Sequence, residues 1–359
     1  MKKHHNSLFA GIAITLLTLA GCGDDDESNR ETTVDEDKAN IETTFDEALN
    51  CIKVLRDGPA MNVLLREFLS LSDGQAFNND WIDDLTLELE DVLDLHQVED
   101  NQRFDIGFYA GTYTYNSVFG WWTKTNDQDN RVVFEFPSTP QEAMNNAVMV
   151  IENYSDTQVQ IESETYYLPN TANVNVTVDG TEIFRLTLRD VDYDSNNDFE
   201  IPVAVDMEIF MNPFTLSITI DRNTTTDFVL DIDFTNDAGC DWGIDAEVQL
   251  DTDDFENLSE DDIESITATL RINDLSIRSL SGIADLLKAD DPSDTEINRL
   301  LDLEVLFNNV KIGDLEYNSE NETVIIFYKD RTSEDSAVYY DDFLDELEAL
   351  LVEFTGEWD

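Results

Sequence analysis

The chain has 359 residues, a formal net charge of -60 at pH 7 and a hydrophobic content of 41%. Such a charge excludes nucleic acid as a partner, because nucleic-acid binding depends on Lys and Arg replacing the counterions of phosphates. The hydrophobic content includes 20 Phe and 11 Tyr, which is too much for a disordered acidic protein, so we expect a folded body with an acidic surface.

The start of the chain, residues 1–21, has the layout of a secretory signal. Lys2 and Lys3 form a positive start, and a mostly apolar run follows from Leu8 to Ala20. As a helix this run would be roughly 20 Å long, which is too short for a hydrocarbon layer of about 30 Å. Residues 1–21 are therefore predicted to be a signal peptide and not a membrane span.

The end of this segment, Leu19-Ala20-Gly21-Cys22, resembles the lipobox of bacterial lipoproteins. The resemblance implies that Cys22 becomes the first mature residue and carries the lipid that anchors the chain to a membrane. In that class an Asp after the cysteine often means inner-membrane retention, whereas here Gly23 follows. We therefore expect an outer-membrane lipid anchor, on the periplasmic side or at the cell surface. An ordinary signal peptide with a chance cysteine is the alternative.

Residues 22–40 are rich in acids and poor in apolar side chains. Asp24 to Glu27 are consecutive acids, and Asp35 to Asp37 continue the charge. Because like charges keep such a segment extended and solvated, we predict a lipidated acidic tether over 22–40.

Apolar residues at helical spacing predict three helices within a helical segment over residues 41–100. Gly58-Pro59 separates the first from the second, Ser72-Asp73-Gly74 ends the second, and Asn79 caps the third. The three apolar stripes consist of Ile41, Phe45, Ala48, Leu49, Ile52 and Leu55; of Met61, Leu64, Leu65, Phe68 and Leu69; and of Trp81, Ile82, Leu85, Leu89, Val92 and Leu93.

From Ile106 onward the apolar period changes from 3.6 to 2, which predicts strands with one buried and one solvated face. Short polar connections at 194–198 and 223–226 indicate hairpins, so consecutive strands should be neighbours in a meander. Residues 283–304 and 339–354 are expected to be helical, and 310–317 and 323–328 to be strands.

The expected fold class is therefore α+β, with a large curved, mostly antiparallel sheet over residues 101–359. The N-terminal helices and a closing C-terminal helix should cover its apolar face, either as a separate segment or as one domain over 41–359. The alternation also turns acids such as Asp231 and Asp245 onto one polar surface, where like charges on neighbouring strands repel.

Few cysteines and histidines remain once the signal and Cys22 are set aside. Cys51 and Cys240 are an even pair in an oxidising compartment, so a disulfide and a buried thiol are both open. His96 is the one mature histidine, which excludes multi-histidine zinc and iron sites. Its position at a predicted helix end favours a structural role over a catalytic triad.

Acids at alternate positions in the 190–200 hairpin suggest calcium, because oxygen ligands at this spacing suit that ion. The pattern departs from a helix–loop–helix calcium site, since Ser195 replaces the required glycine and Ile201 stands where the bidentate Glu should be. A solvated hairpin is the favoured interpretation, and calcium is the alternative. The candidate ligands are Asp190, Asp192, Asp194, Asn196 and Asp198.

Adjacent tryptophans in Gly120-Trp121-Trp122-Thr123-Lys124 suggest an aromatic platform for a sugar. Neighbours on a strand point to opposite faces, so only one of them can lie outside. We expect Phe119 and Trp121 on the core face and Trp122 exposed beside Lys124. Chance exposure of Trp122, or stacking beneath Lys124, is favoured over a sugar contact.

The leading hypothesis for function is a non-enzymatic, membrane-anchored binding or assembly module at the cell envelope, with a protein or glycan partner. The second is a carrier of an apolar, acyl-type ligand, because a curved sheet with helices against it can enclose a cavity. In that general architecture alone it resembles lipoprotein-localisation factors. The third is a carboxylate-based hydrolase of surface polysaccharide. A void lined by Phe and Leu would favour the carrier, whereas a polar cleft with two buried acids would favour the hydrolase.

Overall fold

The computed structural model describes residues 32–62, 104–119, 121–139, 142, 144–161, 164–193, 202–253, 259–279, 282–289, 292–320 and 323–355. The predicted signal peptide, Cys22, the rest of the second helix, the third helix and His96 lie outside these residues. The chain divides into two compact units, which are described separately. Unit 1 is Met1–Lys53 with Ile218–Glu348, and unit 2 is Val54–Ser217 with Ala349–Asp359.

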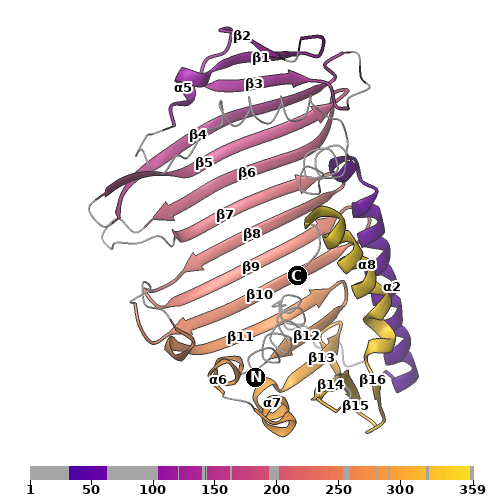
Figure 1. The fold of residues 1–359 in the computed structure, drawn as a ribbon. Helices are drawn as coiled ribbons and strands as arrows, with labels where there is room; N and C mark the ends of the chain where they lie inside the picture. Colours follow the sequence, from indigo (N-terminus) through magenta and orange to yellow (C-terminus); the bar gives the residue numbers. More distant parts are fainter. Residues whose placement is uncertain are drawn as a thin grey trace. The chain divides into compact units, whose positions relative to one another are not determined.

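The described strands form one 16-stranded sheet in the order β16-β15-β14-β13-β12-β11-β10-β9-β8-β7-β6-β5-β4-β3-β1-β2 (Figure 1). This order follows the chain from β3 to β16, so the predicted, mostly antiparallel meander is confirmed. The exception is β1, which pairs with β2 in antiparallel but with β3 in parallel. Two-residue turns at Asp179-Gly180 and Asn308-Asn309 adopt the positive φ that tight hairpins need.

The elements of unit 2 are α5 (Ile106–Tyr109), β1 (Gly111–Asn116), β2 (Trp121–Thr125), β3 (Arg131–Phe136), β4 (Ala147–Ile161), β5 (Glu164–Val178), β6 (Thr181–Tyr193) and β7 (Pro202–Met211). The unit boundary falls within β8 (Phe214–Arg222). The remaining strands are β9 (Asp227–Asn236), β10 (Asp241–Leu250), β11 (Ile263–Ile272), β12 (Leu275–Ser279), β13 (Leu303–Phe307), β14 (Val310–Asn318), β15 (Thr323–Tyr328) and β16 (Ser333–Asp335). The other helices are α2 (Val34–Arg56), the 3-10 turn η5 (Glu260–Asp262), α6 (Ile283–Lys288), α7 (Asp294–Leu301) and α8 (Ala337–Thr355).

The first described helix, α2, begins inside the segment predicted to be a tether. Thr33 and Glu36 form a capping box, in which the Glu36 carboxylate accepts from the Thr33 backbone N–H at 2.9 Å. Asp37 is fully buried, and its carboxylate accepts from the Thr32 hydroxyl and lies 3.3 Å from the Lys329 ammonium. The tether prediction is therefore wrong for residues 34–40, because these acids cap and anchor a helix.

In unit 1, α2 and α8 lie side by side (Figure 1). The Phe45 ring lies 6.1 Å from that of Tyr340 and 5.9 Å from that of Phe343, between ring centroids. Ile41, one turn before Phe45, enters a cluster on the apolar face of the sheet, where burial of each aliphatic side chain stabilises by about 1.5–3 kcal/mol. That buried cluster consists of Ile41, Leu275, Val305, Ile312, Ile326 and Tyr328.

A disulfide joins α2 to the turn between β9 and β10. Its cysteines are Cys51 and Cys240, with Cα atoms 6.1 Å apart and a sequence separation of 189 residues. Both are buried. The sequence left a disulfide and a buried thiol open at this pair, and the structure has the disulfide.

The segment predicted to be helical over 283–304 is two helices and the start of a strand. After α7, Asp302 adopts the left-handed conformation at φ 41°, and β13 follows from Leu303. The two helices bury Ile283, Leu286, Ile297, Leu300 and Leu301 in a cluster of their own. The prediction of helix was wrong at the end of this segment, because the apolar spacing of Leu300, Leu301 and Leu303 suits either a helix or a strand at this boundary.

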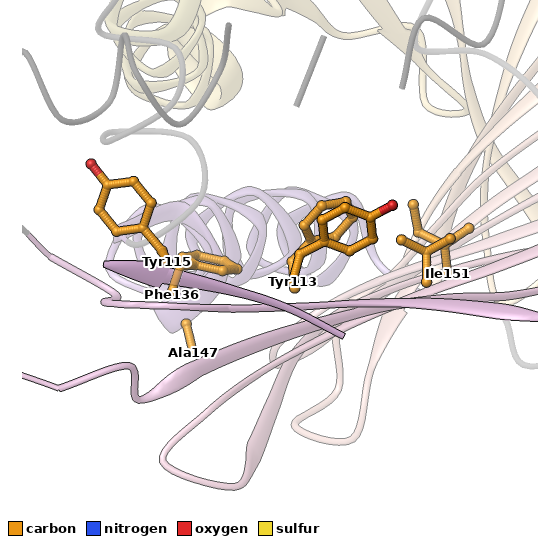
Figure 2. Close-up of a cluster of buried hydrophobic side chains, with 7 residues drawn as sticks. Tyr113, Tyr115, Phe136, Ala147 and Ile151 are labelled. Carbon is orange, nitrogen blue, oxygen red and sulfur yellow. The ribbon is translucent and has the colours of Figure 1, made fainter. Parts of the chain in front are cut away.

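Unit 2 has its core between β1, β3 and β4 (Figure 2). Tyr113 and Tyr115 alternate along β1 onto one face, and the Tyr113 ring stacks on that of Phe134 at 5.1 Å between centroids. Ile106, from which strands were predicted, instead begins the short helix α5, which Asp105 caps by accepting from the Gly107 N–H at 3.0 Å. The core cluster consists of Tyr113, Tyr115, Val132, Phe134, Phe136, Ala147 and Ile151.

The polar face of β9 and β10 places Asp245 directly opposite Asp231. Neighbouring Asp233 forms an ion pair with Arg271, so one acid of this group is compensated by a cation. Burial, together with the facing carboxylate of Asp231, raises the pKa of Asp245 to about 6. The folded protein therefore holds this proton more tightly than the unfolded chain does.

We expect Asp245→Asn to raise the melting temperature at about pH 7.5 and to lose this advantage as the pH falls towards 4.5. Ionisation of Asp245 costs stability as the pH rises from the ordinary pKa of 3.8 past about 6. After discounting for solvent screening at a half-buried site, the gain should be about 1 kcal/mol. The control is Asp237→Asn in the exposed β9–β10 turn, which changes the net charge equally. An equal gain in both variants would contradict the local origin of the effect.

Candidate functional site

An apolar cavity of about 310 Å³ lies within unit 1, between α2, α8 and strands β11 to β15. Thirteen of its 16 lining residues are aliphatic or Phe, and the other three are Ser336, Tyr339 and Tyr340. Phe45 lines the cavity from α2 and Phe343 lines it from α8, and the rings of these two residues contact each other. The cavity is at the lower end of the about 300–1,000 Å³ typical of small-molecule pockets.

Strand periodicity builds the floor of this cavity. Leu303 and Val305 are two residues apart on β13, so their side chains point to one face of the sheet. In the ladders, Ile277 lies opposite Val305, and Leu315 lies opposite both Leu303 and Ile326. The floor is therefore a continuous aliphatic patch contributed by four neighbouring strands.

The polar groups at one side of the cavity are joined in a closed network. The Tyr328 hydroxyl donates to the Glu334 carboxylate at 2.6 Å and lies 2.9 Å from the Tyr339 hydroxyl, which also donates to Glu334. The Lys38 ammonium pairs with the same carboxylate at 2.5 Å. The charges of Glu334 and Lys38 thus compensate each other, and both tyrosine hydroxyls have a hydrogen-bond acceptor.

The pKa values of this network follow from its burial and its hydrogen bonds. Burial and the Glu334 carboxylate together raise the pKa of Tyr339 to about 12, and they raise that of Tyr328 as well. Although burial acts in the opposite direction, Lys38 and the two tyrosines lower the pKa of Glu334. At neutral pH the tyrosines are therefore hydrogen-bond donors and Glu334 is ionised.

Two other polar side chains, Tyr340 and Ser336, line the cavity, and Ser336 donates its hydroxyl to the Val324 carbonyl at 2.6 Å. With this donor engaged, and with Tyr339 held by Glu334, the lining favours apolar contact over polar recognition. The arrangement can bind an apolar group by excluding water.

A larger hollow of about 520 Å³ in unit 1 is polar and lies over α7, β14 and β15. Two of its polar side chains bond within the protein: Asp294 accepts from the Ser319 N–H at 2.9 Å, and the Asn298 side chain bonds both backbone groups of Tyr317. These bonds hold neighbouring segments of the fold together, so the two side chains already have a structural role. The apolar cavity is therefore the stronger candidate for a ligand site.

Two candidate calcium ligands, Asp190 and Asp192, are exposed near the end of β6, where Asp190 lies opposite Asp206. The other three, Asp194, Asn196 and Asp198, lie outside the described residues. Within the described ranges no group of three His, Cys, Asp or Glu side chains is arranged to hold a metal ion.

None of the described helices has the length and apolarity to span a bilayer.

The exposed tryptophan is Trp121 and not Trp122, so that prediction was wrong. The Trp122 ring packs edge-on against Tyr115 and Phe134 at 5.2 and 5.4 Å between centroids. Trp121 is 51% exposed, and its ring stacks on that of Phe119. The alternation places the pair on opposite faces, and packing against Tyr115 decides which one is inside.

The carboxylates with raised pKa values, Asp233 and Asp245, lie on the polar face of β9 and β10 and do not line the cavity. Burial raises the pKa values of both carboxylates, whereas a catalytic acid–base pair needs one pKa raised and the other kept low. This arrangement does not favour the polysaccharide hydrolase.

Comparisons of this chain with protein-family models, with curated proteins and with solved structures found no match.

Proposed function

We propose that this protein is an envelope-tethered carrier that binds an apolar, acyl-type ligand in the cavity between α2, α8 and the sheet. The observation that carries the proposal is the 310 Å³ cavity itself, because 13 of its 16 lining residues are aliphatic or Phe and its size is within the range of small-molecule pockets. An apolar surface of this size gains contacts and excludes water when a hydrocarbon lies against it. The tether rests on the resemblance of Leu19–Cys22 to a lipobox.

The polar side of the cavity favours a ligand with an uncharged end. The Glu334 carboxylate would repel a ligand carboxylate, and the Lys38 ammonium that would attract one is already paired with Glu334. The hydroxyl groups of Tyr328 and Tyr339 are engaged with the same carboxylate. An acyl chain ending in an alcohol, an ester or an amide fits these charges better than a free fatty acid.

The test is cavity filling by Leu315→Trp, which places a large side chain in the floor of the void. Binding of the neutral fluorophore N-phenyl-1-naphthylamine should weaken at least about tenfold, since the space and its apolar contacts are lost. The matched control is Val338→Trp, at a position that is 72% exposed on α8. Melting curves of both variants show whether the fold is retained.

Unchanged fluorophore binding in a folded Leu315→Trp variant, or an equal loss in Val338→Trp, would overturn the proposal. A smaller substitution, Val324→Leu, covers the case in which tryptophan is too large for the fold, and it should weaken binding by a few-fold. A fatty alcohol that displaces the fluorophore more effectively than a fatty acid of equal length supports the uncharged end.

A further inference from the structure

A cluster of exposed apolar side chains surrounds the tip of the hairpin formed by β1 and β2 in unit 2. Val118 is 82% exposed, Phe119 62%, Trp121 51% and Met144 77%. The Phe119 and Trp121 rings stack with centroids 4.8 Å apart and planes 10° from parallel. The side-chain amide of Asn145 donates to the Tyr115 carbonyl at 2.9 Å, which places the Met144 segment beside the same hairpin.

The hairpin tip is held in place by bonds and packing on its other side. Asn116 lies opposite Trp121 in the ladder, and its side-chain oxygen accepts from the Val118 N–H at 3.1 Å. Trp122, on the opposite face of β2, packs into the core against Tyr115. The turn that carries the exposed rings is therefore supported by contacts other than those of the rings themselves.

The charge pattern of this region differs from that of the rest of the chain. The chain contains 80 Asp and Glu residues, yet none occurs from Ile106 to Asn126, and no stretch after residue 23 is as long without one. Lys124 is the one charged residue in this stretch. On neighbouring segments, Glu135 bonds the Thr114 hydroxyl on β1, and Glu142 is exposed on the loop that carries Met144.

We propose that this tip, Val118, Phe119, Trp121 and Met144, inserts into the interfacial region of a lipid bilayer with zwitterionic headgroups. Trp and Phe are the side chains suited to that region, because their rings are apolar and the Trp N–H can reach a polar partner. Because Ile106 to Asn126 contain no Asp or Glu, this hairpin can enter the interface without the cost of removing water from a carboxylate. The proposal is independent of the cavity and of its ligand.

The test is partition onto phosphatidylcholine vesicles of a chain that begins at residue 23. This chain lacks the signal and Cys22 and keeps every described residue. We expect the chain to float with the vesicles, and the double variant Phe119→Ser with Trp121→Ser to partition at least about tenfold less. Val338→Ser, which removes an exposed apolar residue of unit 1, should partition like the parent chain. Equal binding by the double variant, equal loss in Val338→Ser, or no binding by the parent chain would overturn the proposal.

A second readout places Trp121 itself in the bilayer. Phosphatidylcholine brominated on its acyl chains should quench part of the tryptophan fluorescence of the parent chain. Trp121→Phe should keep the partition and lose the quenching, whereas persistent quenching would assign the contact to another tryptophan and contradict the model of insertion. Adding phosphatidylglycerol should weaken binding at low salt and less so at about 1 M salt, where charges are screened within about 3 Å.

Discussion

Replacing Cys51 and Cys240 together by alanine is expected to lower the free energy of unfolding by about 2–5 kcal/mol. The bond closes a loop of 189 residues, so its loss frees a large part of the unfolded chain. It also ties the end of α2 that lies beyond Phe45 to the β9–β10 turn. Chemical denaturation of the oxidised parent chain and of the double variant measures the difference.

The parent chain under reducing conditions is the control, because it breaks the same bond without changing the packing of either side chain. The reduced parent and the double variant should unfold at the same denaturant concentration, both below the oxidised parent. If all three unfold together, the disulfide contributes nothing to the stability of unit 1.

Gly282→Ala is expected to destabilise unit 1 by about 3 kcal/mol or more. Gly282 precedes α6 with φ at 87°, a conformation that costs other residues about 1–2 kcal/mol. A Cβ at this position would stand 2.1 Å from the Leu300 carbonyl oxygen and 2.8 Å from its carbon. Because these are backbone atoms of α7, α6 and α7 would have to separate, and their buried cluster would open.

Gly239→Ala separates the two causes. Gly239 also lies in unit 1 at positive φ, 99°, but a Cβ there meets nothing within 4 Å. This variant should lose only the conformational part, about 1 kcal/mol. Thermal unfolding of both variants measures the comparison, and equal losses would mean that the contact with Leu300 relaxes at no cost.

Local periodicity predicted most of the fold. The apolar stripe of residues 339–354 predicts α8, which spans Ala337–Thr355, and strand alternation predicts β14 and β15 within a residue. These patterns are sufficient because each element has one face against the core. The acids of residues 34–40 misled the prediction, since their number favoured a solvated tether. The spacing of Thr33 and Glu36 was the signal that a helix begins there.

Two features of the candidate sites depended on contacts that a local pattern does not contain. Phe119 and Trp121 do lie on one side of the hairpin, as their spacing predicts, but the packing of Trp122 against Tyr115 makes that side the exposed one. The cavity depends on how far α2 and α8 stand from strands that are distant in sequence. The sequence predicts apolar residues such as Phe45 and Leu315 on facing surfaces. The same pattern is compatible with a tightly packed interface and with one that contains a cavity.

The position of α2 in the chain has a consequence for biogenesis. Ile41 and Phe45 emerge early during synthesis, but the surface on which they pack, at Leu275 and beyond, emerges more than 200 residues later. At about 5–20 residues per second the helix waits roughly 10 to 50 s for its docking surface. During that interval its apolar stripe is open to solvent and to chaperones, and chains that end before β12 never cover it.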